Sequence, residues 1–142
     1  MPMAGFRVLG HTADVGLAAW GPDLRSAFAQ AALGMFSLMA DRRAIRPLVS
    51  RRIRVEATDR EALLVAWLTG LLYYVDSERL LFRTATIQDF SETSLTAHAR
   101  GEPAQEGRHR LRAVVKAATY HQLKVQRRSP QGGWRVQVYL DV

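Results

Sequence analysis

The chain has 142 residues, of which 48% are hydrophobic and 23% charged, a composition typical of a globular domain and unlike that of disordered or collagen-like chains. It contains no cysteine, which excludes disulfide scaffolds, thiolate zinc sites, iron–sulfur clusters and cysteine nucleophiles. The net charge of +7 favours an anionic partner. We read no signal peptide in the first residues and no uncharged stretch long enough to cross a bilayer, so we expect a cytoplasmic protein without a membrane partner.

The first third of the chain predicts two strands and a helix. The strands are expected from Phe6 to Leu9 and from Val15 to Trp20, and a short loop containing His11 and Asp14 joins them. Asp23 is placed to cap a helix that ends near Asp41. The apolar residues of this helix recur at helical spacing: Leu24, Phe28, Ala31, Met35 and Leu38.

The middle of the chain predicts a half-exposed strand followed by a buried helix. Side chains alternate between apolar and charged from Leu48 to Ala57, which is typical of a strand with one face in solvent. Asp59 is placed to cap a second helix, whose apolar surface is wide enough for a central element. Gly70 lies inside this helix at a cost of about 1 kcal/mol relative to alanine, so we expect another part of the chain to approach closely there.

The last part of the chain predicts mostly strands. Paired strands are expected from Leu80 to Ile87 and from Thr93 to Ala99, followed by a mobile loop from Arg100 to Arg110. Leu111 to Gln126 is compatible with a strand or a short helix, and we favour extended structure with a turn near His121. Ser129 to Gly133 predicts a hairpin turn, and Trp134 to Leu140 a closing strand. We therefore expect residues 1–142 to form a single α+β domain, with two helices on one face of a largely antiparallel sheet.

Carboxylates gather at the end of the sequence. Asp141 is followed only by Val142, whose terminal carboxylate then lies beside the Asp141 side chain. If the loop between the first two strands approaches this end, Asp14 adds a third oxygen donor. Clustered carboxylates share a proton or bind a hard cation such as Ca²⁺ or Mg²⁺, and the alternative is a pair of solvated carboxylates at a frayed end.

Two further residues are candidates for chemistry. His11 precedes Asp14 by three positions, a spacing that permits a ligand role or a local structural hydrogen bond. Lys116 and Lys124 are the only lysines in a chain that otherwise uses arginine, so Lys116 is either a functional point charge or an ordinary lysine whose stem lies along the surface.

Arginines cluster in two places: at Arg42, Arg43, Arg46, Arg51, Arg52 and Arg54, and again at Arg108, Arg110 and Arg112. These clusters are candidate contact surfaces for RNA or an acidic protein, or simply solvated faces. They contain no interleaved aromatic residues, which argues against a stacking platform for single strands.

Six segments together resemble the archease family, and they cover the chain from end to end. The segments are HTADVGL at 11–17, AALGMFSLMAD at 31–41, LLVAWLTGLLYYVDSERLLF at 63–82, ARGE at 99–102, VKAATYHQLKV at 115–125 and the final W-x5-L-D-V. The resemblance implies an α+β fold and a role as a protein cofactor, not an enzyme, of the RtcB-type RNA ligase in tRNA splicing and RNA repair. A family member of this kind promotes metal- and GTP-dependent guanylylation of the ligase and multiple turnover.

The resemblance also implies roles for individual residues. Asp14 and Asp141 fall on the family's metal-binding acids, and Val142 on the terminal residue that contributes an oxygen, for a divalent ion that we expect to be Ca²⁺, Mg²⁺ or Mn²⁺. Lys116 falls on the lysine of the family's VKA-TYH segment, and with His11 we expect it to act in activating the partner. We assign no catalytic residue.

The sequence departs from the archease pattern at one place, and two alternative functions remain open. Archease sequences commonly carry an Asn-Glu pair where this chain has Thr69-Gly70. The first alternative function is a basic RNA-binding or chaperone-like module that contacts RNA directly. The second is a metal-dependent phosphoesterase, for which two or three oxygen donors are few.

Overall fold

The computed structural model describes residues 3–10, 14–130 and 132–142. The elements in chain order are β1 (Gly5–Leu9), β2 (Asp14–Gly21), α1 (Leu24–Met39), the 3₁₀ helix η1 (Arg42–Ala44), β3 (Val49–Glu56), α2 (Arg60–Glu78), β4 (Leu80–Phe90), β5 (Ser94–Pro103), α3 (Glu106–His109), β6 (Ala117–Arg127) and β7 (Trp134–Asp141).

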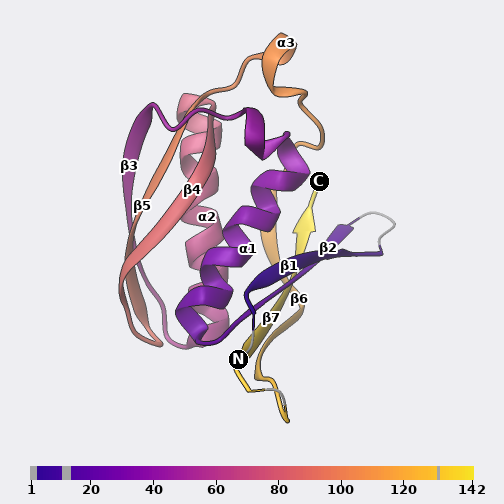
Figure 1. The fold of residues 1–142 in the computed structure, drawn as a ribbon. Helices are drawn as coiled ribbons and strands as arrows, with labels where there is room; N and C mark the ends of the chain where they lie inside the picture. Colours follow the sequence, from indigo (N-terminus) through magenta and orange to yellow (C-terminus); the bar gives the residue numbers. More distant parts are fainter. Residues whose placement is uncertain (1–2, 11–13, 131) are drawn as a thin grey trace.

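The strands form two antiparallel sheets with the two long helices between them (Figure 1). One sheet has the order β1-β2-β7-β6 and the other the order β3-β5-β4. Each long helix contacts strands of both sheets, α1 against β2 and β4, and α2 against β3 and β6. The α+β class and the antiparallel pairing are confirmed. The expectation of one sheet is wrong, because both helices are apolar on more than one side and a single sheet would leave one of those sides in water.

Both helices begin where the capping residues predict. The Asp23 Oδ1 atom accepts a hydrogen bond from the Ser26 amide at 2.8 Å, and Asp59 Oδ1 accepts one from the Ala62 amide at 2.7 Å. Helix α1 ends at Met39, just before the expected Asp41. The carboxylate of Asp41 instead accepts from the Arg43 amide and so caps η1.

Gly70 marks the close approach that its position in α2 predicts. A Cβ atom at this residue would lie 3.0 Å from Ile53 Cγ2 and 3.3 Å from Val55 Cγ1, both in β3. The core continues along α2 to Trp67, which is fully buried and donates its indole N–H to the Phe28 carbonyl at 2.9 Å.

The predicted loop from Arg100 to Arg110 is only partly correct. Strand β5 continues to Pro103, and Glu106–His109 forms the short helix α3. Gly101 permits this continuation, because a Cβ atom there would overlap the Leu81 carbonyl of β4. Two residues inside the predicted loop, Glu102 and His109, are almost completely buried.

The end of the chain forms a hairpin, as predicted. Strands β6 and β7 pair on either side of the turn, and the register of β6 is interrupted between Thr119 and Lys124, close to the turn expected near His121. Gln122 adopts a left-handed conformation in this interruption, with φ of 50°. Strand β7 lies in the middle of its sheet, between β2 and β6, so the end of the sequence meets the beginning.

Candidate functional site: a carboxylate pair at the end of the four-stranded sheet

The sheet register brings Asp14 and Asp141 together. Asp14 is the first residue of β2 and Asp141 the last of β7, and the two are direct partners across the antiparallel ladder. Directly opposed residues project from the same face of a sheet, with Cβ atoms about 5 Å apart. Both side chains are partly exposed. Two acidic side chains far apart in the sequence therefore share one position at the end of the sheet.

Lys116, the residue just before β6, lies on the other side of Asp141 from β2. The Lys116 amide donates to the Asp141 carbonyl at 2.7 Å, and the following residue, Ala117, is the register partner of Asp141. Lys116 is exposed, whereas Val115 before it is buried. Val142 follows Asp141, and its half-buried side chain packs against the core. The Lys116 backbone and the Val142 side chain are thus held beside the carboxylate pair.

His11 lies outside the described residues. The structure brings together Asp14, Asp141, Val142 and Lys116, and the metal-binding and partner-activating roles of all five residues stay predictions.

The donor set consists of oxygen atoms. The Asp14 and Asp141 carboxylates and the main-chain oxygens of Val142 suit a hard divalent cation such as Ca²⁺, Mg²⁺ or Mn²⁺. In the described part of the chain, no three His, Cys, Asp or Glu side chains gather where they could hold a metal ion. Because Ca²⁺ takes six to eight oxygen ligands and Mg²⁺ six, the remaining ligands of such an ion would come from water or from a partner.

Backbone hydrogen bonds hold the segment that leads to Lys116 against α1. After α3, the amides of Arg112 and Ala113 donate to the carbonyls of Met39 and Leu38, at 2.8 and 3.2 Å. These two carbonyls belong to the last turn of the helix, where they have no partner within the helix. The segment 110–116 therefore runs from the end of α1 to the carboxylate pair along a defined path.

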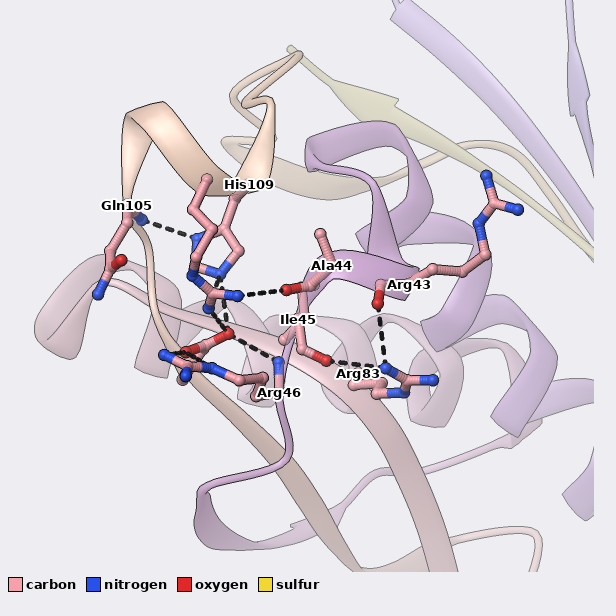
Figure 2. A network of polar contacts seen from close by, with 9 residues as sticks. Arg43, Ala44, Ile45, Arg46, Arg83, Gln105 and His109 are labelled. Atoms are coloured by element: carbon pink, nitrogen blue, oxygen red, sulfur yellow. Dashed lines mark hydrogen bonds and ion pairs between the residues drawn. The ribbon is translucent and has the colours of Figure 1, made fainter.

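A buried polar cluster anchors the start of this segment (Figure 2). Glu102, on β5, is 1% exposed, and its Oε2 atom accepts from the Arg46 amide at 2.7 Å and from His109 Nε2 at 2.9 Å. The guanidinium groups of Arg46 and Arg108 form ion pairs with the same carboxylate. Arg108 also donates to the Ala44 carbonyl of η1 at 3.0 Å. One carboxylate thus ties α3 to η1 and to β5.

Both ring nitrogens of His109 have polar partners. Its Nδ1 atom accepts from the Gln105 amide at 2.8 Å, and its Nε2 atom lies 2.9 Å from Glu102 Oε2 and 2.9 Å from Arg108 Nη2. The ring is fully buried.

The surrounding donors keep Glu102 ionised. Burial raises the pKa of the Glu102 carboxyl, but hydrogen bonds from the Arg46 amide and from the His109 and Arg108 side chains outweigh burial. They lower the pKa from the usual 4.5 to about 2. The cluster therefore contains a buried anion at neutral pH, with positive charge on two sides.

Most arginines of the two sequence clusters bind groups within the protein. Arg42 donates to the Arg83 carbonyl, Arg112 donates to the Ser37 carbonyl, and Arg51 forms an ion pair with Glu78. Together with Arg46 and Arg108, these side chains hold the fold together, which weakens the interpretation of the clusters as a contact surface.

The Glu102 cluster was not predicted from the sequence. Glu102 stands between Gly101 and Pro103, and this composition indicates a loop. The available signal was the segment ARGE, which the resemblance includes but which carries no chemistry by itself. A buried acid with partners at positions 46, 108 and 109 is visible only after folding.

Comparison with known proteins agrees with the fold. Residues 6–142 match the Archease protein family. The chain belongs to the archease family. It is 38% identical to Protein archease of Sulfurisphaera tokodaii over 87% of this chain and 90% of that protein, and 37% identical to Protein archease of Thermococcus gammatolerans over 93% and 94%. The solution structure of Methanobacterium thermoautotrophicum protein 1598 superposes with a TM-score of 0.80 at 35% identity, covering 97% of this chain and 99% of that one.

Thr69-Gly70, where the resemblance implies an Asn-Glu pair, lies away from the carboxylate pair. Gly70 faces β3 in the three-stranded sheet, whereas Asp14 and Asp141 belong to the four-stranded sheet. Among the described residues, no helix is both long and apolar enough to cross a membrane.

Proposed function

We propose that this protein is a non-catalytic activator of an RtcB-type RNA ligase in the cytoplasm, acting in tRNA splicing and RNA repair. It promotes the metal- and GTP-dependent guanylylation of the ligase and so allows multiple turnover. Membership of the archease family supports this proposal, and the opposition of Asp14 and Asp141 across β2 and β7 is the structural observation that carries it. RNA is then the substrate of the partner.

The carboxylate pair makes one end of the four-stranded sheet acidic. Asp14, Asp141 and a main-chain oxygen of Val142 would hold a divalent ion, and such an ion neutralises phosphate charge during nucleotidyl transfer. Because the protein itself supplies few ligands, positions remain for oxygens of a partner or its nucleotide. The exposed Lys116 beside Asp141 adds a positive point charge that suits a phosphate group. His11 is proposed to act with Lys116 toward the partner.

The phosphoesterase alternative is less well supported. Enzymes that cleave phosphodiesters with two metals hold them about 4 Å apart in a dense set of ligands. The described residues offer two carboxylates at this position and no group of three. Hydrolysis of RNA by the purified protein alone, abolished by a chelator, would favour this alternative over ours.

A turnover assay tests the proposal. The ligase is incubated with GTP, Mn²⁺ or Mg²⁺ and an excess of RNA ends, with and without this protein. We expect added protein to raise the number of ligations per ligase molecule at least tenfold, and Asp141→Ala to abolish the increase. No increase with the intact protein would contradict the proposal.

A matched control distinguishes the effect of losing the carboxylate pair from the effect of losing one negative charge anywhere on the protein. Asp89 is an exposed aspartate on β4, in the other sheet. Asp89→Ala removes the same charge as Asp141→Ala, and we expect it to retain full stimulation. Equal loss in both variants would contradict an assignment to the carboxylate pair.

A further inference from the structure

The four-stranded sheet has one face that neither long helix covers. The helix-facing residues include Leu17, Ala19, Val136 and Val138, which belong to the buried core. Successive side chains of a strand point to opposite faces, so the residues between them project away from α1 and α2. We call this second side the outer face. Figure 1 shows both long helices on the other side of the sheet.

Two aromatic rings lie on the outer face, one on each central strand. Trp20 of β2 lies across Gly5, where a Cβ atom would come within 2.9 Å of the indole ring. Tyr139 of β7 lies across Gly16, where a Cβ atom would come within 2.9 Å of the phenol ring. Because Tyr139 is the register partner of Gly16, the two rings are four residues apart along the strands, roughly 13 Å at a rise of about 3.3 Å per residue.

The part of the outer face between the two rings consists of buried residues. Ala18 and Gln137 face each other in the row between the rings and are 0% and 8% exposed. The Gln137 side-chain Nε2 donates to the Gln122 carbonyl at 3.0 Å, which holds the interrupted part of β6 beside this face. The neighbouring His121 packs its ring edge-on against Tyr139, with centroids 5.7 Å apart. The Tyr139 ring is therefore packed against a neighbour on this face.

Cations border the rings on both edges of the sheet. Arg7 on β1 and Lys124 on β6 lie at the two ends of the row that contains Ala18 and Gln137. Arg135 on β7 is the register partner of Trp20. In the described part of the chain, none of these three side chains forms an ion pair, and Arg7 and Lys124 are exposed. Their positive charge is available to an anionic ligand.

One further cation lies over an aromatic ring. The Arg128 guanidinium is 5.8 Å from the centroid of Trp20. Among the described residues, the register places only two acidic side chains on the outer face, those of Asp14 and Asp141 at its far end. The outer face is thus basic and aromatic over most of its length and acidic at one end.

We propose that the outer face binds a single-stranded polynucleotide, with bases stacked on Trp20 and Tyr139 and phosphates held by Arg7, Lys124 and Arg135. Every base has a π face that stacks on an aromatic ring, and phosphates pair with cations along the backbone, so this combination suits single strands of any sequence. An acidic polypeptide would use the cations but not the rings. The sequence argument against a stacking platform concerned the two arginine clusters, which contain no interleaved aromatic residues. On the outer face, aromatic and basic residues come from separate strands and interleave only in the folded sheet.

This binding is independent of ligase activation and is measured without the ligase. Fluorescence anisotropy of a labelled twelve-nucleotide oligouridylate is followed as the full chain is added. The face variant carries Arg7→Ala, Lys124→Ala and Arg135→Ala. The control variant carries Arg52→Ala, Arg54→Ala and Arg100→Ala, which remove the same charge from the outward side of the other sheet. Circular dichroism confirms that both variants are folded.

We expect the face variant to bind the oligonucleotide at least tenfold more weakly and the control variant to bind within twofold of the intact protein. Three phosphate contacts predict that the logarithm of affinity falls with the logarithm of salt concentration with a slope of about −2. Equal weakening in both variants, or no binding by the intact protein, would overturn the proposal.

The contribution of stacking is tested separately. Tyr139→Leu should weaken binding of the oligonucleotide several-fold, whereas Tyr139→Phe should retain it, because the ring remains. An RNA duplex of the same length should bind more weakly than the single strand, since its bases are already stacked. Duplex binding as tight as that of the single strand, or displacement of the oligonucleotide by polyglutamate at equal charge concentration, would show a general anion surface and overturn the proposal.

Discussion

Glu102 and His109 form a hydrogen-bonded pair that is almost completely buried, with His109 Nε2 2.9 Å from Glu102 Oε2. The pair joins β5 to α3, and the segment after α3 runs along the end of α1 to Lys116 beside Asp141. A buried charge on one sheet therefore fixes the path of a segment that ends at the candidate site on the other sheet.

The charge of Glu102 is predicted to stabilise the fold. Glu102→Gln leaves the guanidinium groups of Arg46 and Arg108 without their anion. Breaking a buried ion pair costs about 3–5 kcal/mol, and the partial exposure of both arginines reduces our expectation to about 2–3 kcal/mol in the free energy of unfolding. Urea denaturation measures this loss. The exposed Glu56, which pairs with Arg54, provides the control Glu56→Gln, with an expected change below about 0.5 kcal/mol. Similar losses in the two variants would contradict the account.

The same carboxylate predicts a dependence of stability on pH. The pKa of Glu102 is lowered from 4.5 to about 2 on folding, so the folded state favours the ionised form. Its contribution to stability is fully present above about pH 4.5 and is lost as the pH falls from there toward 2. The difference in free energy of unfolding between the intact protein and Glu102→Gln should shrink across this range. A difference that stays constant from pH 6 to pH 3 would show that the pKa of Glu102 is not lowered.

His109 is predicted to hold the segment that leads to Lys116. In His109→Ala, the bonds to Gln105 and Glu102 are lost, and we expect faster hydrogen exchange at the amides of Arg112 and Lys116. The control is His98→Ala, at a partly exposed residue of β5. Unchanged exchange at both amides in His109→Ala would contradict a positioning role.

Gly16 is predicted to be required for the position of the Tyr139 ring. A Cβ atom there would lie 2.9 Å from Leu9 Cβ and from the Tyr139 ring. Gly16→Ala should reduce the free energy of unfolding by about 1–3 kcal/mol through overpacking and should also weaken oligonucleotide binding. Gly10→Ala is the control, because a Cβ atom at Gly10 meets nothing within 4 Å. Normal stability of Gly16→Ala would contradict the close packing of this ring.

The local structure was largely predictable from the sequence. Asp23 and Asp59 mark the starts of both long helices because a capping side chain acts on the amide three residues ahead, and Gly70 marks a close approach because the cost of glycine in a helix needs a reason. The capping signal depends on residues close together in the sequence, and the glycine signal depends on a single residue, so both can be found without knowing the fold.

The meeting of residues far apart in the sequence was predictable only where we assumed that two segments approach each other. The meeting of Asp14 and Asp141 was expected on the condition that the first loop approaches the end of the chain, and the register of β2 and β7 fulfils that condition. The division into two sheets, the buried Glu102 and the outer face were not predicted. Each of these features depends on which strands pair. For Glu102 the local composition also misleads, because it indicates a loop.

The central claim is that Asp14 and Asp141 act as one unit in activating the ligase, and a double-mutant cycle tests it most directly. Ligase turnover is measured with the intact protein, with Asp14→Asn, with Asp141→Asn and with both changes together. Residues that act as a unit are strongly non-additive, so each single variant should lose nearly as much stimulation as the double variant. Losses that multiply in the double variant would show that the two carboxylates act independently and would contradict the account.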